Sequence, residues 1–127
     1  MQIKTKKTDG AAKVYDVYRV AGNRSEFISG VHTDLRKDKV IVSSTAGGST
    51  KVSLGNRKAS INFVQTVEAG TRDAAVKELV DAKMELVSSL PAGMSDEAAL
   101  ELITNVKEFF SQSAAELLAI VRRGVIS

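Results

Sequence analysis

Hydrophobic and polar residues alternate along the first half of the chain, in short segments separated by turn sequences. The turn sequences are Asp9-Gly10, Gly22-Asn23, Gly47-Gly48 and Gly55-Asn56. Because strand side chains alternate between two faces, Val-, Ile-, Tyr-, Phe- and Thr-rich segments between such turns predict an antiparallel meander. The predicted strands are Gln2–Lys7, Lys13–Val20, Ser25–His32, Lys37–Thr45, Ser49–Leu54 and Arg57–Glu68.

The same alternation predicts which residues share a face. A loop at residues 46–48 places Val42 opposite Val52, and a turn at residues 55–56 places Val52 opposite Ala59. One face then collects the apolar side chains Val40, Val42, Val52, Leu54, Ala59, Ile61 and Phe63. The other face collects Lys37, Lys39, Ile41, Ser43, Lys51, Ser53, Lys58, Ser60 and Asn62. We therefore predict one apolar face and one basic, polar face.

After Gly70 the apolar spacing becomes helical. Thr71 can cap a helix that runs to about Ser89, with Val76, Leu79, Val80 and Val87 along one side. A second helix is predicted to begin at Ser95, with apolar residues at the spacing of one helix face: Ala99, Leu102, Ile103, Val106, Phe109 and Phe110.

The second helix is predicted to break near Ser111–Ser113. Residues 113–116, Ser-Ala-Ala-Glu, have the pattern of a capping box, so a final helical segment is predicted over Ala114–Arg123 with Gly124 as its stop. If residues 96–123 were one helix, it would be roughly 42 Å long, whereas a compact monomer of this size has a radius of gyration of about 14 Å. Such an arm would overhang its own sheet, and a second copy of the chain is the simplest cover. The predicted dimer interface is Leu102, Ile103, Val106, Phe109, Phe110 and Leu117.

Charge divides at the same place as the periodicity. Residues 1–69 carry 12 Lys/Arg and 6 Asp/Glu, whereas residues 70–127 carry 6 and 9. A basic sheet beside acidic helices predicts one polyanion-binding surface. The RNA-binding candidates are therefore the polar residues of the basic face, because Lys contacts phosphates while Ser and Asn can bind bases or riboses: Lys37, Lys39, Ser43, Lys51, Ser53, Lys58, Ser60 and Asn62. The alternative interpretation is an ordinary solvated sheet face.

The composition gives little support for an enzyme. The 127 residues include no Cys and one His, His32, which has no neighbouring Ser/Asp pattern. Gly47-Gly48 lacks the Lys-Ser/Thr and the helix of a phosphate-binding loop. We expect no catalytic residues, cofactor or metal site. The chain has neither an apolar leader nor a run long enough to span a bilayer, so we expect a soluble protein made in the cytoplasm.

The order of elements resembles the coat proteins of single-stranded RNA bacteriophages (leviviruses). Residues 63–71, Phe-Val-Gln-Thr-Val-Glu-Ala-Gly-Thr, followed by Val76-Lys77, are similar to the Caulobacter RNA-phage branch of that family, as are Ala12-Lys13-Val14 and Ser25-Glu26-Phe27. The resemblance implies an α+β fold: an N-terminal hairpin and meander, then two or three C-terminal helices on one sheet face. It also implies one coat-protein domain over residues 1–127, with residues 1–69 as the sheet and 70–127 as a helical dimerisation arm.

The resemblance further implies the function. Two chains would form an intertwined homodimer with a continuous sheet, and dimers would assemble into an icosahedral shell in the cytoplasm of a host bacterium. The inner sheet face would contact genomic RNA, and a dimer could repress translation by binding an RNA hairpin, although no stacking Tyr of the well-studied members has a convincing match. The alternative is a cellular, dimeric RNA- or single-strand-binding module that forms no shell. A small-ligand enzyme or carrier would need a polar pocket that the pattern does not predict.

Overall fold

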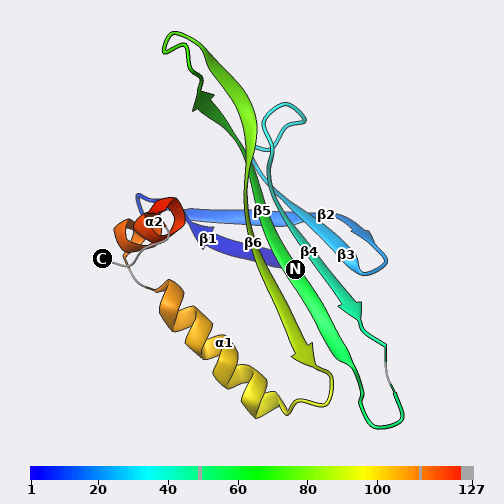
Figure 1. Ribbon diagram of the computed structural model, residues 1–127. Coiled ribbons are helices and arrows are strands. Elements are labelled where there is room, and N and C mark those ends of the chain that lie inside the picture. The colour runs from blue at the N-terminus through cyan, green and yellow to red at the C-terminus, as the bar shows by residue number, and fades with distance from the viewer. Residues whose placement is uncertain (49, 112, 124–127) are drawn as a thin grey trace. The chain divides into compact units, whose positions relative to one another are not determined.

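The computed structural model describes residues 1–48, 50–111 and 113–123. Its N-terminal part is a six-stranded antiparallel sheet (Figure 1). The strands lie in the sheet in their order along the chain. Their bounds are β1 Gln2–Lys6, β2 Ala12–Ala21, β3 Arg24–Ser29, β4 Asp38–Ala46, β5 Asn56–Gly70 and β6 Lys77–Pro91. The predicted meander and the α+β fold class are confirmed, and five of the six predicted strands are present.

The predicted strand Ser49–Leu54 is wrong in the residues that the structure describes. Residues 50–54 form turns in which the Ser53 N–H donates to Thr50 Oγ1 (3.0 Å), and the Val52 side chain is 100% exposed. This segment lies in one long loop between β4 and β5, which pair directly as far as Ala46 opposite Arg57. Gly55 closes the loop with a φ of +78°, a conformation that glycine adopts without a Cβ clash.

The direct pairing of β4 with β5 changes the register but keeps most of the predicted faces. Val42 lies opposite Ile61 and not Val52, and Val40 lies opposite Phe63. Val40, Val42, Ala59, Ile61 and Phe63 therefore share a face as predicted, whereas Val52 and Leu54 do not belong to the sheet. The core lies on this apolar face, where Tyr15, Phe27 and Val40 are buried and Ile3, Val42 and Ile61 pack against them.

The predicted helix from Thr71 to Ser89 is also wrong, because residues 77–91 form β6. Every residue of β6 is paired with β5, from Gly70 opposite Lys77 to Asn56 opposite Pro91. The segment also has a two-residue period, since Val80, Ala82, Met84 and Leu86 alternate with polar residues. Pairing with β5 along fifteen residues places the side chains of Val80, Ala82, Met84 and Leu86 on the same face as Ile61 and Phe63. Each residue's intrinsic preference for helix is small, so this pairing decides the structure of the segment.

The two C-terminal helices have the predicted bounds. Helix α1 spans Asp96–Phe110. Ser95 is its N-cap residue, and Ser95 Oγ accepts a hydrogen bond from the Ala98 N–H (3.2 Å). Helix α2 spans Ala114–Arg123, and Ser113 Oγ accepts from the Glu116 N–H (3.3 Å), which is one half of the predicted capping box. The predicted break between them is confirmed, and the predicted stop at Gly124 lies outside the described residues.

The chain divides into two compact units, Met1–Pro91 and Ala92–Ser127. The predicted boundary between residues 69 and 70 is therefore wrong, because β6 belongs to the sheet. No residue of α1 is buried, and Ile103 and Phe110 of its apolar stripe are 55% and 51% exposed. Neither helix within the described residues is long and apolar enough to cross a membrane.

A buried carboxylate joins three strands on the apolar face. Asp38 of β4 accepts hydrogen bonds from Tyr15 Oη of β2 (2.9 Å) and Ser29 Oγ of β3 (2.7 Å), and it pairs with Lys13 Nζ at 2.7 Å. Burial alone would raise the pKa of Asp38, but the hydrogen bonds from Lys13, Ser29 and Tyr15 outweigh it and lower that pKa. For Lys13, burial opposes the charge, yet the bonds to Asp38 and Tyr15 raise its pKa. The folded sheet therefore favours the charged pair.

Candidate nucleic-acid interface

The sheet face opposite the core carries most of the predicted RNA-binding residues. The pairs Ser43–Ser60 and Ile41–Asn62 place β4 and β5 side chains together, and Glu85 of β6 lies beside Asn62. We call this surface the polar face. Across β3 to β6 its members are Arg24, Glu26, Ile28, Lys39, Ile41, Ser43, Thr45, Lys58, Ser60, Asn62, Val64, Thr66, Asp81, Lys83, Glu85, Val87 and Ser89.

The structure brings together six of the eight candidates. Five belong to the polar face: Lys39, Ser43, Lys58, Ser60 and Asn62. Lys37 lies at the end of the face, just before β4, where its N–H donates to Thr66 Oγ1 (2.8 Å). Lys51 and Ser53 lie in the loop between β4 and β5, so their predicted position on the sheet is wrong. That prediction depended on the strand that is not formed.

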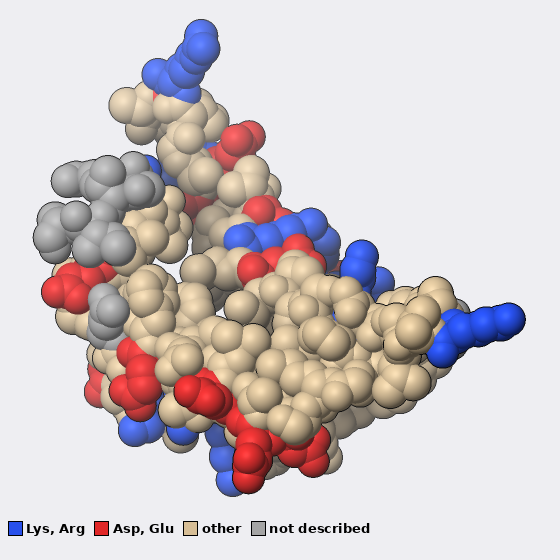
Figure 2. Space-filling view, turned by 60° about the horizontal axis from the view of Figure 1, so that its bottom comes forward, with Lys and Arg blue, Asp and Glu red and all other residues tan. Residues whose placement is uncertain are grey.

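Acidic residues occupy more of the polar face than the sequence pattern indicated. Strand β6 adds Asp81 and Glu85, which were expected on a helix. Lys37 Nζ lies 3.1 Å from Asp81 Oδ2, and hydrogen bonds from Lys37 and Thr66 lower the pKa of Asp81. Figure 2 shows basic and acidic side chains close to one another on the surface that it draws. The polar face is therefore a mixed surface with basic positions, and an exposed cation such as Lys58 is a better phosphate ligand than Lys37.

Glu26 organises the basic side chains at one end of the polar face. Its carboxylate lies 3.3 Å from Arg24 Nη2, 3.6 Å from Lys39 Nζ and 3.9 Å from Arg19 Nε. Three cations therefore surround one carboxylate. The carboxylate draws the three basic side chains together and leaves an excess of positive charge, which attracts a phosphate.

Two hydroxyls and an amide lie at the centre of the polar face. Ser43 Oγ and Ser60 Oγ are hydrogen-bonded to each other at 2.8 Å. Asn62 Oδ1 is buried and has no hydrogen-bond partner among the described residues. A buried acceptor that lacks a partner costs about 1–3 kcal/mol. The unpaired amide oxygen of Asn62 is therefore an unfavourable feature at the centre of the polar face.

The sequence pattern did not single out Tyr18 or Arg19. They lie at an irregularity in the pairing of β2 with β3, where Val17 is opposite Phe27 and Arg19 is opposite Glu26. Tyr18 is thus an extra residue in β2, and it lines a hollow on the polar face together with Arg19. No local sequence signal marks such a bulge, because its position is set by the partner strand.

The described residues contain no group of three or more His, Asp or Glu side chains that could hold a metal ion. His32 lies in the loop between β3 and β4, and its Nδ1 accepts a hydrogen bond from the Asp38 N–H (3.0 Å). This histidine therefore supports the backbone beside the buried carboxylate.

Comparison with solved structures identifies the fold. The virus-like particle subunit of Wenzhou levi-like virus 4 matches with a TM-score of 0.77 and 18% identity over 98% of this chain and 89% of that one. That of Beihai levi-like virus 32 matches at 0.74 and 16% over 91% and 88%. The coat protein of bacteriophage EMS014 matches at 0.61 and 12% over 84% and 69%. No protein-family model matches the chain, and no curated protein matches it in sequence. The chain therefore has the fold of the coat protein of bacteriophage EMS014 and of the particle subunits of these two levi-like viruses.

Proposed function

We propose that this chain is the coat protein of a single-stranded RNA phage, which dimerises, assembles into an icosahedral shell and packages genomic RNA. The observation that carries the proposal is the match to subunits of virus-like particles along nearly the whole chain. The protein would then be a structural component of the virion, assembled in the cytoplasm of a host bacterium, and not an enzyme.

The free edge of β6 supports dimerisation. Strand β6 ends the sheet order and has fifteen residues, whereas the opposite edge strand, β1, has five. A long edge presents many unpaired backbone N–H and C=O groups to another chain, and a very short edge presents few. We infer that β6 pairs with β6 of a second copy, which would make one continuous sheet across the dimer.

The apolar surfaces of the two units support the same dimer. On the sheet, Phe63 and Met84 of the apolar face are 40% and 59% exposed. On α1, the apolar stripe is exposed as well. Removing such surfaces from water stabilises by about 25 cal/mol per Å². We propose that the helices of each copy cover the apolar sheet face of the other, through the predicted interface Leu102, Ile103, Val106, Phe109, Phe110 and Leu117.

RNA would bind the polar face, which the partner's helices leave open. Lys58 and Lys39 supply contacts to phosphates, while Ser43, Ser60 and Asn62 supply hydrogen bonds. In a closed shell this face would line the interior. The same dimer would repress translation if it bound one RNA hairpin in preference to other RNA sequences.

The direct test is expression of the chain alone in bacteria, followed by electron microscopy and nucleic-acid analysis of the purified material. We expect closed particles that contain RNA. Dimers that bind RNA and form no particles would instead support the cellular single-strand-binding module. A stable monomer without nucleic acid would contradict both functions.

Replacing Lys58 by Ala is expected to weaken RNA binding and reduce its salt dependence. Lys58 is exposed on β5 and takes part in no ion pair within the described residues. Each phosphate contact with a single strand contributes about 0.7 to the slope of log affinity against log salt, so the slope should fall by about this amount for each Lys58 that contacts RNA. Affinity is measured at several salt concentrations by fluorescence anisotropy with a labelled RNA.

The matched control is Lys107→Ala, which removes the same charge from helix α1 instead of from the polar face. Its slope should equal that of the wild type. An unchanged slope in Lys58→Ala, or an equal reduction in both variants, would show that the polar face is not the phosphate-binding surface.

A further inference from the structure

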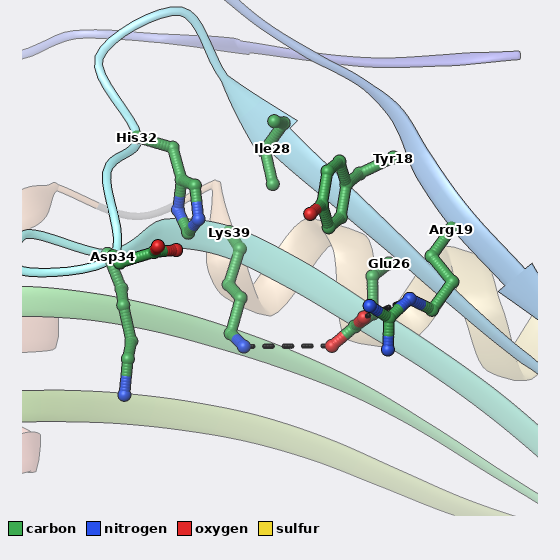
Figure 3. A pocket seen from close by; sticks show the side chains of 8 residues that line it. Tyr18, Arg19, Glu26, Ile28, His32, Asp34 and Lys39 are labelled. Carbon is green, nitrogen blue, oxygen red and sulfur yellow. Dashed lines mark ion pairs between the residues drawn. The ribbon is translucent and has the colours of Figure 1, made fainter.

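The bulge in β2 places Tyr18 and Arg19 on one side of the sheet. In a regular strand, neighbouring side chains point to opposite faces, but a bulge sets two residues against one residue of the partner strand. Here Tyr18 and Arg19 both line a hollow of about 240 Å³ on the polar face, together with Glu26, Ile28 and Lys39 (Figure 3). His32, Asp34 and Lys37 complete its lining.

The hollow combines an aromatic ring with a cationic wall. The Tyr18 side chain is 60% exposed, although it is a large, partly apolar group on a sheet surface. Figure 3 shows Glu26 between Lys39 and Arg19, with Tyr18 and Ile28 on the adjoining wall. The Arg19 guanidinium lies over the Tyr18 ring at 5.8 Å from its centroid. The ring therefore faces a cation on one side, and its 60% exposure leaves part of its surface open to a flat, apolar partner.

The donors around the ring suit a phosphate and a base edge. Arg19 and Lys39 are held by Glu26 at 3.9 and 3.6 Å, so they are positioned in advance while sharing one negative charge. His32 accepts a hydrogen bond at Nδ1, which leaves Nε2 as the donor of the neutral ring. An aromatic face, fixed cations and a ring N–H form the combination by which proteins hold an unpaired nucleotide.

We propose that this hollow binds one unpaired RNA nucleotide, whose base stacks on Tyr18 and whose phosphate contacts Arg19 and Lys39. The inference deepens and rests on the proposed packaging of RNA. It adds a preference for single-stranded over duplex RNA, because a base within a duplex has no free face to stack on the ring. The preference would depend on Tyr18 and Arg19, which are not among the eight RNA-binding residues predicted from the sequence.

The test compares Tyr18→Ala and Tyr18→Phe with wild type, using a labelled single-stranded RNA and a duplex of the same length. Stacking on an aromatic side chain is worth about 1–3 kcal/mol per base, so Tyr18→Ala should bind the single strand about 5- to 150-fold more weakly. Tyr18→Phe keeps the ring and should bind as wild type does. Duplex affinity should be unchanged in both variants.

The matched control is Val20→Ala, an exposed β2 residue whose partner, Ser25, lies beside Val42 on the apolar face. It should not change RNA affinity. Ultraviolet cross-linking of an RNA containing 5-iodouridine, followed by mass spectrometry, should attach RNA to the peptide containing Tyr18.

The failures of the two proposals are distinguishable. If wild-type particles contain RNA but Tyr18→Ala binds single strands as tightly as wild type, the stacking site is wrong and packaging stands. Equal losses in Tyr18→Ala and Tyr18→Phe would also overturn stacking, because the ring would not be the determinant. A wild-type protein that binds no single-stranded RNA would overturn both proposals.

Discussion

Replacing Lys83 by proline is expected to abolish dimers and particles while the sheet of each chain stays folded. The backbone directions in the sheet give the reason. The Thr66 N–H donates to the Lys37 carbonyl at 2.8 Å, so the backbone of Thr66 points toward β4. The backbone N–H and C=O groups of successive residues point to alternate sides of a strand. Those of Phe63 therefore point toward β6, where they exchange hydrogen bonds with the backbone of Met84. It follows that the N–H of Lys83 points out of the sheet edge, where a second copy would pair.

Proline at position 83 removes this outward donor without breaking a bond between β5 and β6. Proline is tolerated on edge strands for this reason, and it favours extended backbone in the residue before it. Met84→Pro is the matched control, because it removes an N–H that points inward to β5. We expect Met84→Pro to lower the free energy of unfolding by roughly 1–3 kcal/mol, because a β5 carbonyl within the sheet loses its donor.

Light scattering, electron microscopy and thermal unfolding followed by circular dichroism measure the two effects. The expected result is that Lys83→Pro is monomeric and forms no particles but retains the strand spectrum. Particles at wild-type yield from Lys83→Pro would show that β6 is not the dimer edge. The inference about edge pairing would then be wrong, although the fold would stand.

Replacing Asp38 by asparagine is expected to cause the largest loss of stability of any single polar substitution in the sheet. Asp38 is 6% exposed and holds Lys13, Tyr15 and Ser29 at 2.7–2.9 Å. Removing one partner of a fully buried ion pair costs about 3–5 kcal/mol, and because the Lys13 side chain is 20% exposed we expect a loss near the lower end of that range. A typical domain is stable by only about 5–15 kcal/mol, so Asp38→Asn should lower the denaturation midpoint markedly. The control is Asp16→Asn, an exposed carboxylate that accepts a hydrogen bond from Gln2 Nε2 (2.7 Å), with an expected change within about 0.5 kcal/mol.

The pH dependence of this effect has a definite sign. The pKa of Asp38 is lowered on folding, so its contribution is present above the unfolded value of about 3.9 and is lost as pH falls through the folded pKa. The pKa of Lys13 is raised, so its contribution is present below about 10.4 and is lost as pH rises through the folded pKa. Denaturant unfolding of wild type and Asp38→Asn should therefore differ most between about pH 5 and 9 and converge in strong acid. A difference that stays constant to pH 2 would show that packing, and not the ion pair, is lost.

Local signals in the sequence were sufficient for much of this fold. Ser95 and Ser113 mark helix starts because a hydroxyl that caps an N–H acts within three residues, and both helices begin there. The alternation from Val40 to Val42 and from Ala59 to Phe63 identified one face of two strands because each side chain's direction depends only on its own strand. The order of elements also pointed to the coat-protein fold, which the structural comparisons support.

The sequence alone was therefore sufficient for five strands of the first half, for the starts of both C-terminal helices and for the polar character of one sheet face. The tertiary structure alone decided that residues 77–91 form a strand, that residues 50–54 form a loop and that Tyr18 faces the candidate interface. These features depend on long-range pairing: β5 supplies fifteen backbone partners to β6, β4 pairs with β5 across a long loop, and β3 opposes two β2 residues with one. A segment whose apolar residues fit both a helix and a strand adopts the one for which the rest of the chain provides hydrogen-bond partners and a face to cover.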